Sequence, residues 1–216
     1  MSYKTTTGKG GISATIVADS VSAVTGTRIT TMELVYHRLI HSQVNTHRQF
    51  SRNAMSSRAV PVERMLELVE MSPAVPIRFG KKQSGMVSEV ECGNPIDIDA
   101  LCGDPCYEYS LTPEQAWLKA KDEAVNIAKA FDKAGYAKET TNRLLEPYQM
   151  VKVLVTATEW DNFFHLRLHS DAQPEIQELA RVMKDAMEGS EPETLQAGEW
   201  HTPYVEHFRD DQDELR

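Results

Sequence analysis

Alternation of apolar and polar positions marks the stretches of the chain that are expected to form β-strands. Residues 12–37 contain a run rich in β-branched side chains, followed by a segment that partly alternates apolar and polar residues. A shorter apolar run covers residues 150–155. Both patterns are typical of strands, so we predict extended structure in these two regions.

Apolar residues at helical spacing predict a long helix over residues 113–134. Thr112 can cap this helix, Pro113 suits its first turn, Gln115 completes a start resembling a capping box, and Gly135 is placed to end it. An apolar stripe along the helix is expected to pack in the core rather than to carry chemistry. The stripe consists of Trp117, Ala120, Ala124, Ile127, Ala128 and Phe131.

Shorter helices are predicted on both sides of this long one. They cover about 38–46, the stretch after Pro61, a segment carrying Asn142 and Arg143, residues 159–168, and a final amphipathic helix that begins at Pro174. Strands and helices in this order predict an α+β fold, with a mixed or antiparallel sheet flanked by helices. We assign residues 12–207 to one such domain.

Both ends of the chain and one internal stretch lack a regular pattern. Residues 1–11 hold threonines and a glycine-rich run, for which we expect a flexible N-terminal arm rather than a phosphate loop. Residues 80–110 are interpreted as a loop-rich insertion, because Gly, Pro and Asp interrupt any period. Residues 208–216 are expected to form a frayed acidic C-terminal tail.

Composition restricts the class of protein. The 216 residues are 41% hydrophobic and 25% charged, as in an ordinary globular protein. No apolar run is long enough for a membrane helix and no secretory signal is visible, so we expect a cytoplasmic protein that binds no membrane. The net charge of -9 argues against a partner that is a nucleic acid polymer.

Cysteine and histidine spacing gives no indication of a metal site. Cys92, Cys102 and Cys106 crowd into one loop-like segment, with spacings that match no common zinc pattern. His37 and His41 are four residues apart but lack a third ligand in register. We therefore predict no bound metal.

Positive charge is concentrated in one stretch of the chain. No acidic residue lies between Glu33 and Glu63, and Arg48, Arg52 and Arg58 fall inside that gap. Each guanidinium offers a planar fork of donors to phosphate, and nearby Ser and Asn side chains add neutral donors. We call residues 46–58 the cationic motif, and we expect it to begin at the end of a short helix and to continue as a loop. The pattern favours a site for a small anionic ligand, with a solvated cationic surface as the alternative.

Two separated blocks of this sequence resemble the flavin-dependent thymidylate synthase family. The first block is the series His47-Arg48, Ser51, Asn53, Ser56 and Arg58. The second is Asn162-Phe163-Phe164-His165-Leu166-Arg167, followed by Asp171-Ala172-Gln173-Pro174-Glu175-Ile176. Arg143 lies between the blocks, where the family has an arginine before a strand. The order and spacing of all three agree over about residues 12–185.

The chain departs from the family pattern at several positions. Thr46 stands where the motif has its first arginine, and Ala54 stands where it commonly has glutamate. Asp171 replaces a histidine near the flavin, while Thr156 and Thr158 replace an asparagine and an arginine. The chain therefore resembles a divergent branch associated with bacteriophages, which implies a bacterial or phage-infected host cell.

The resemblance also implies roles for individual residues. Arg167 is the expected catalytic residue, facing the pyrimidine and polarising its O2/N3 edge. The expected substrate-binding residues are Gln43, Thr46, Ser56, Ser57, Arg58 and Arg143. The expected cofactor-binding residues are His47, Arg48, Asn53, Thr156, Thr158 and Asn162.

Members of this family methylate dUMP reductively to dTMP, using FAD, NADPH and 5,10-methylenetetrahydrofolate. They assemble as homotetramers with active sites built between subunits, and the resemblance implies the same reaction and assembly here. Two alternatives stay open because of the departures. Either the fold serves a different pyrimidine nucleotide, by hydroxymethylation or by acting on dCMP, or the chain binds a nucleotide and has lost flavin chemistry.

Overall fold

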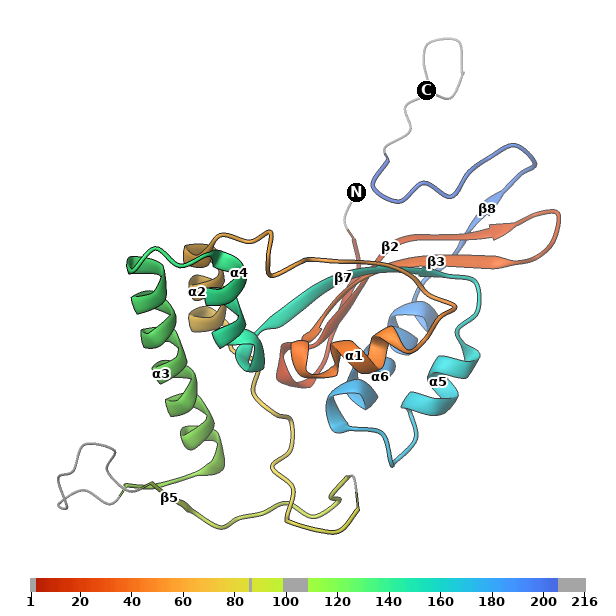
Figure 1. The fold of residues 1–216 in the computed structure, drawn as a ribbon. Helices are drawn as coiled ribbons and strands as arrows, with labels where there is room; N and C mark the ends of the chain where they lie inside the picture. The colour runs from red at the N-terminus through yellow and green to blue at the C-terminus, as the bar shows by residue number, and fades with distance from the viewer. Residues whose placement is uncertain (1–2, 86, 99–108, 206–216) are drawn as a thin grey trace.

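A six-stranded sheet forms the centre of the computed structural model, which describes residues 3–85, 87–98 and 109–205 (Figure 1). Neighbouring strands in the order β1, β2, β3, β7, β4 are antiparallel, and β8 pairs in parallel with β2. The strands are β1 Thr5–Thr7, β2 Ser13–Ser22, β3 Arg28–His37, β4 Ser51–Ala54, β7 Met150–Ala157 and β8 Glu193–Leu195. The predicted α+β fold is confirmed.

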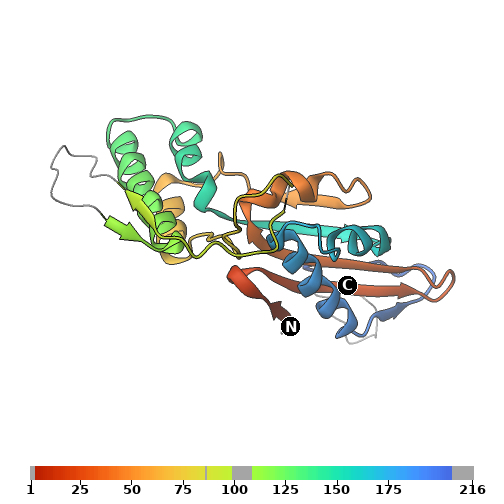
Figure 2. The ribbon, with the colours of Figure 1, turned by 90° about the horizontal axis from the view of Figure 1, so that it is seen from below.

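The helices gather in two places around this sheet. Their bounds are α1 His41–Asn45, α2 Val62–Met71, α3 Pro113–Lys133, α4 Lys138–Thr141, α5 Asp161–Arg167 and α6 Pro174–Glu188. In Figures 1 and 2, α5 and α6 lie against one face of the sheet, while α2, α3 and α4 group at one end of it. Three 3₁₀ helices connect the described elements: η1, Lys9–Gly11, lies between β1 and β2, η2, Arg38–Ile40, precedes α1, and η3, Asn142–Tyr148, follows α4.

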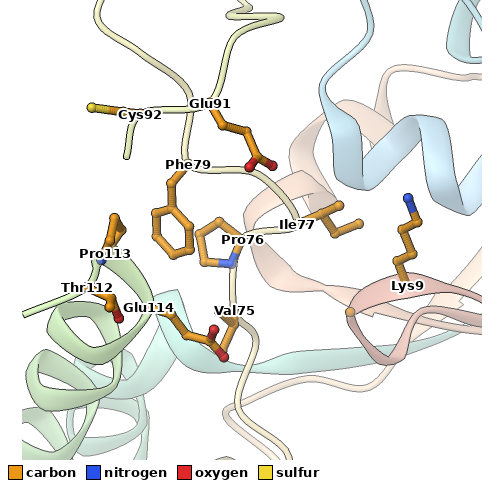
Figure 3. Close-up of a pocket in the computed structure, with 11 residues that line it drawn as sticks. Lys9, Val75, Pro76, Ile77, Phe79, Glu91, Cys92, Thr112, Pro113 and Glu114 are labelled. Carbon is orange, nitrogen blue, oxygen red and sulfur yellow. The ribbon is translucent and has the colours of Figure 1, made fainter. Parts of the chain in front are cut away.

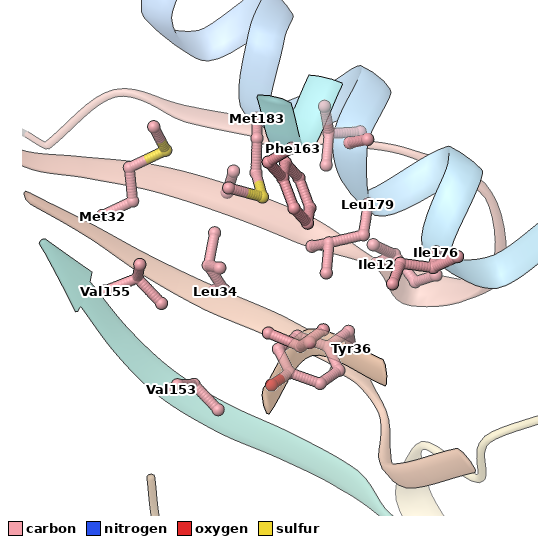
Figure 4. Packing of buried hydrophobic residues seen from close by; sticks show 14 of the residues in the cluster. Ile12, Met32, Leu34, Tyr36, Val153, Val155, Phe163, Ile176, Leu179 and Met183 are labelled. Atoms are coloured by element: carbon pink, nitrogen blue, oxygen red, sulfur yellow. The ribbon is translucent and has the colours of Figure 1, made fainter. Parts of the chain in front are cut away.

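The main core lies between the sheet and α6. Met32, Leu34 and Tyr36 alternate along β3 and are completely buried, as the period of two requires for a strand with one covered face. The same cluster includes Leu179 and Met183 of α6, which point toward the strands in Figure 4. The predicted apolar face of this last helix is therefore confirmed.

The stripe predicted to pack α3 into the core is covered only in part. A second, smaller core joins α2, α3 and η3, and α3 contributes only Val125 and Ala128 as fully buried residues. Ile127 is 49% exposed, and Ala120 is exposed as well. Because α3 packs on a narrow contact at the end of the sheet, its neighbours decide which part of the apolar stripe is covered.

The ends of α3 agree with the sequence signals. The Thr112 hydroxyl accepts the Gln115 backbone N–H at 3.2 Å, and the Gln115 side chain accepts the Thr112 N–H at 3.0 Å. Gly135 follows the helix with φ of +83°, a conformation that side chains rarely adopt. Local chemistry therefore sets the limits of this helix.

We predicted that the cationic motif continues as a loop, and this prediction is wrong. The middle of the motif forms β4, which pairs antiparallel with β7, so that Ser51 lies opposite Thr156 and Asn53 opposite Leu154. Such pairing cannot be read from the motif, because the hydrogen bonds come from a strand about a hundred residues later in the sequence. The motif is thus divided into a part before β4 and a part after it.

The irregular stretches contain some ordered structure. Residues Thr5–Thr7, inside the expected N-terminal arm, form β1 at the edge of the sheet. Inside the loop-rich insertion, β5 (Ile96–Ile98) pairs with β6 (Tyr109–Leu111). The acidic tail, Cys102 and Cys106 lie outside the described residues. Among the helices that the structure describes, none has the length and apolar character to cross a membrane.

Candidate functional site

Arg167 makes direct contact with the cationic motif, 120 residues earlier in the sequence. Its Nε donates a hydrogen bond to His47 Nε2 at 3.0 Å, and its Nη2 donates to the Thr46 hydroxyl at 3.3 Å. The Thr46 hydroxyl in turn donates to the backbone carbonyl of Gln43 at 2.7 Å. The two blocks of sequence therefore meet at a single guanidinium.

An aromatic cluster fixes this meeting point. Phe163 of α5 lies edge-on to the His47 ring with centroids 4.8 Å apart, and packs on Phe50 at 5.1 Å. Trp160 contacts Phe50 at 4.9 Å. Phe163 and Arg167 are four residues apart and share one side of α5, so docking the phenyl ring carries the guanidinium to His47.

The bond from Arg167 decides the protonation of His47. Because Nε2 accepts a hydrogen bond, the imidazole is neutral and carries its proton on Nδ1. Burial lowers the pKa of His47, and the nearby charges of Arg167 and Arg52 lower it further. Arg52 itself donates to the backbone carbonyl of His47 at 2.7 Å. This arginine therefore supports the fold of the motif, whereas the sequence had suggested a phosphate contact.

A hollow of about 410 Å³ opens beside this cluster. We call it the His47 hollow, and its lining is Thr46, His47, Arg48, Gln49, Asn162, Leu166 and Arg167. Arg48 and Asn162 are exposed here. The guanidinium of Arg48 makes no hydrogen bond or ion pair with the described part of the chain, so its charge is free for a ligand. The hollow thus joins three of the expected cofactor contacts to the expected catalytic residue.

Arg167 also lines a larger cavity, of about 630 Å³. We call it the Gln43 cavity, because Gln43 lines it together with Gln173 and Glu175 from the start of α6. Gln43 Nε2 donates to Gln173 Oε1 at 2.6 Å. Gln173 and Glu175 belong to the second matched block, but the sequence assigned them no role. The available signal was a carboxylate two residues after an amide at the start of the last predicted helix.

The remaining expected substrate contacts lie beyond β4. Ser56 and Arg58 line a hollow of about 490 Å³, the Arg58 hollow, with Lys138 and Glu139 of α4. Arg58 is exposed and pairs with Glu139 at 3.8 Å. Ser57 is buried, and its backbone carbonyl accepts a hydrogen bond from Asn142 Nδ2 at 2.7 Å. Lys138, which the sequence reading missed, adds a cation to this hollow.

Arg143 lies in η3. Its neighbour Asn142 connects this helix to the segment that follows β4. The side chain of Arg143 is exposed and pairs with Glu146 at 3.4 Å. Asn142 is completely buried and also donates to the carbonyl of Val60 at 3.0 Å. The structure therefore divides the expected substrate residues between two regions, with Gln43 and Thr46 before β4 and the others after it.

The expected cofactor residues are divided as well. Asn53 and Thr156 alternate with core-facing positions on β4 and β7, so they belong to the face of the sheet opposite α5 and α6. The Thr156 hydroxyl lies 2.7 Å from that of Thr31, which in turn lies 2.8 Å from His201 Nε2. Thr158 is exposed between β7 and α5.

A further cavity, of about 570 Å³, is separate from these residues. Figure 3 shows it between Lys9, the segment around Pro76 and the start of α3 at Pro113. Cys92 also lines this cavity, but no residue that the sequence predicted for the site does so. The predicted site residues that do line a hollow are found around Arg167 and Arg58.

Comparison with known proteins agrees with the geometry. The family model described as thymidylate synthase complementing protein matches residues 9–193. This range contains both sequence blocks and every residue that lines the His47 hollow, the Gln43 cavity or the Arg58 hollow. No curated protein is similar enough to the chain to count as a match. On the length of the family match, the chain belongs to the thymidylate synthase complementing protein family, the flavin-dependent thymidylate synthases.

Proposed function

We propose that this protein converts dUMP to dTMP, with 5,10-methylenetetrahydrofolate as carbon donor, NADPH as reductant and FAD as bound cofactor. One observation carries the proposal: the Arg167 guanidinium is held by His47 and Thr46 between the His47 hollow and the Gln43 cavity. A cationic group fixed between two hollows is suited to a reaction that brings a nucleotide next to a cofactor.

Arg167 is the proposed catalytic residue. A guanidinium has five N–H donors, and the bonds to His47 and Thr46 use only part of them. The remaining donors can bind the O2/N3 edge of a pyrimidine and stabilise negative charge that develops on the ring. Because its bonds and the aromatic cluster already hold the side chain, little reorganisation is needed during the reaction.

The His47 hollow fits an anionic cofactor on chemical grounds. The free guanidinium of Arg48 matches a phosphate group, and the exposed amide of Asn162 adds donor and acceptor atoms. The Nδ1 proton of neutral His47 is a further donor. A flavin bound there would supply the reducing chemistry, which no side chain can provide. His47, Arg48 and Asn162 would bind and orient it.

We propose that the active site is completed by a neighbouring chain in a homotetramer. Arg58 and Arg143 are the proposed phosphate contacts, yet β4 separates them from Arg167. Four residues of extended strand span roughly 13 Å. Two chains that place the Arg58 hollow of one beside the Arg167 region of the other would bring the phosphate contacts and the base contact to one nucleotide.

Purified protein tests this function directly. We expect flavin absorbance in the visible spectrum, oxidation of NADPH that depends on dUMP, and formation of dTMP detected by mass spectrometry. The Arg167→Ala variant should lose most of its turnover while its circular dichroism spectrum stays unchanged. Protein that takes up no flavin and shows no NADPH oxidation with dUMP would rule the function out.

A further inference from the structure

Three side chains form a continuous hydrogen-bonded series that ends at the Gln43 cavity. Glu175 is only 3% exposed, and its Oε1 accepts the backbone N–H of Ile77 at 2.8 Å. Its Oε2 accepts from Gln173 Nε2 at 2.9 Å. Gln173 Oε1 then accepts from Gln43 Nε2 at 2.6 Å. The series therefore runs from a buried carboxylate to a residue that lines the cavity.

The direction of this series follows from the chemistry of its first member. A carboxylate only accepts hydrogen bonds, so Gln173 must turn its NH₂ group toward Glu175 and its carbonyl toward Gln43. Gln43 must then turn its own NH₂ group toward Gln173. Its carbonyl Oε1 is left over, and among the described residues this oxygen has no hydrogen-bond partner.

Gln43 and Arg167 thus present complementary groups to the same cavity. Both residues line it, and the Thr46 hydroxyl connects them by donating to the Gln43 backbone carbonyl and accepting from Arg167. Arg167 supplies only donors, whereas the Gln43 side chain supplies an acceptor. A ligand edge that pairs a carbonyl oxygen with an N–H group satisfies both.

We propose that Glu175 and Gln173 are positioning residues that orient the Gln43 amide so that the cavity selects a uracil base over a cytosine base. This inference rests on the proposed function, and it specifies the base that the site accepts. Uracil has a proton on N3 for Gln43 Oε1 and a neighbouring carbonyl for Arg167. Cytosine has a lone pair on N3, which would face the Gln43 carbonyl without a proton between them.

The variant Glu175→Gln should reverse this selection. The backbone N–H of Ile77 still needs an acceptor, so it would take the carbonyl of the new amide, whose NH₂ group would then face Gln173. Gln173 would turn its carbonyl toward position 175 and its NH₂ group toward Gln43. The Gln43 side chain would consequently present its NH₂ group to the cavity, which suits the N3 lone pair of cytosine.

Calorimetric titration of the full-length protein with dUMP and with dCMP measures this selection without turnover. We expect the wild-type protein to bind dUMP roughly 10-fold or more tightly than dCMP, because the wrong base leaves a buried polar group unpaired. In Glu175→Gln the ratio should fall to one or below. If the role of Glu175 were merely structural, the substitution would weaken the binding of both nucleotides alike and leave the ratio of their affinities unchanged.

Glu178→Gln is the matched control. Glu178 lies on the same helix, is also largely buried, and binds the backbone N–H of Lys9 and the side chain of Arg181 instead of the cavity. Its substitution should leave the dUMP to dCMP ratio unchanged. If Glu175→Gln does not fold, Gln43→Met removes the acceptor directly and should bring the ratio close to one.

The outcomes separate this inference from the proposed function. A wild-type protein that prefers dUMP and makes dTMP, together with an unchanged ratio in folded Glu175→Gln, overturns the role of Glu175 and Gln173 alone. A ratio that reverses in a protein unable to make dTMP supports the role and refutes the function. Equal binding of both nucleotides by the wild-type protein, or binding of neither, overturns the inference.

Discussion

The regions around Arg167 and Arg58 carry similar groups but are built differently. Arg167 is held by hydrogen bonds to His47 and Thr46 and supported by an aromatic cluster. Arg58 and Arg143 are exposed, and their ion pairs with acidic side chains are 3.8 and 3.4 Å long. A fixed guanidinium suits a base whose charge changes during reaction, whereas loosely paired arginines suit the capture of a phosphate, which can displace their partners.

The largest effect should follow from breaking the fixed region. In Arg167→Ala we expect kcat/KM for dUMP to fall by about 10² to 10³, the loss seen when a donor to developing charge is removed. Arg167→Lys keeps the charge but not the two directed bonds, so it should recover only part of the rate. Steady-state NADPH oxidation measures both variants. Activity of the alanine variant close to that of the wild type would contradict the assignment.

Arg58→Ala should weaken the binding of dUMP rather than slow the chemical step. Loss of one charge-assisted bond to phosphate corresponds to roughly a 10-fold to 100-fold rise in the KM for dUMP, with kcat changed only a few-fold. The wild-type KM should rise with ionic strength, and the variant should lose part of that dependence. Arg64→Ala, on the exposed side of α2, is the matched control. A fall in kcat at constant KM would contradict the division between the regions.

Asn142→Ala should lower stability through the Arg58 region alone. The change leaves the buried carbonyls of Ser57 and Val60 without their donor, which costs about 1–3 kcal/mol. For a chain of this size, each kcal/mol corresponds to a decrease of about 2–4 °C in Tm. Thermal unfolding measures the shift, and Asn126→Ala on the exposed side of α3 serves as control. An equal shift in both variants would contradict the role of Asn142.

The smallest effect is a pH dependence that belongs to the Arg167 region. Burial and the charges of Arg167 and Arg52 lower the pKa of His47, whereas a histidine in the unfolded chain has a pKa of about 6.5. The unfolded state therefore binds more protons below about pH 6.5, and stability should fall as the pH decreases. Tm measured between about pH 7.5 and 5.5 should show this slope. His47→Asn should have a shallower slope.

Local signals in the sequence predicted much of the fold. The extended structure of β2 and β3, the cap at Thr112 and the apolar face of α6 each depend on residues close together in the chain. The strand β4 and the exposed side of α3 were not predictable, because pairing with β7 and the width of a packing contact are decided by distant segments. Composition does not reveal which neighbour an element will meet.

The candidate site was likewise predictable only where local sequence signals decide it. The two sequence blocks indicated that Arg167 belongs with the cationic motif, but not that Arg52 binds a backbone carbonyl instead of an anion. Nor did they show that Glu175 and Gln173 connect to Gln43. Side-chain hydrogen bonds depend on ångström-scale placement, which a sequence motif does not contain. Residue types were therefore easier to predict than their partners.

The buried amide of Asn142 also has a consequence for motion. It joins the segment of Ser57 and Val60 to the 3₁₀ helix that carries Arg143. This amide therefore ties together the two segments that carry the proposed phosphate-binding arginines, and we expect a ligand that shifts one segment to shift the other. Backbone amides on both segments should become protected from hydrogen exchange together when nucleotide binds, with a common dependence on its concentration.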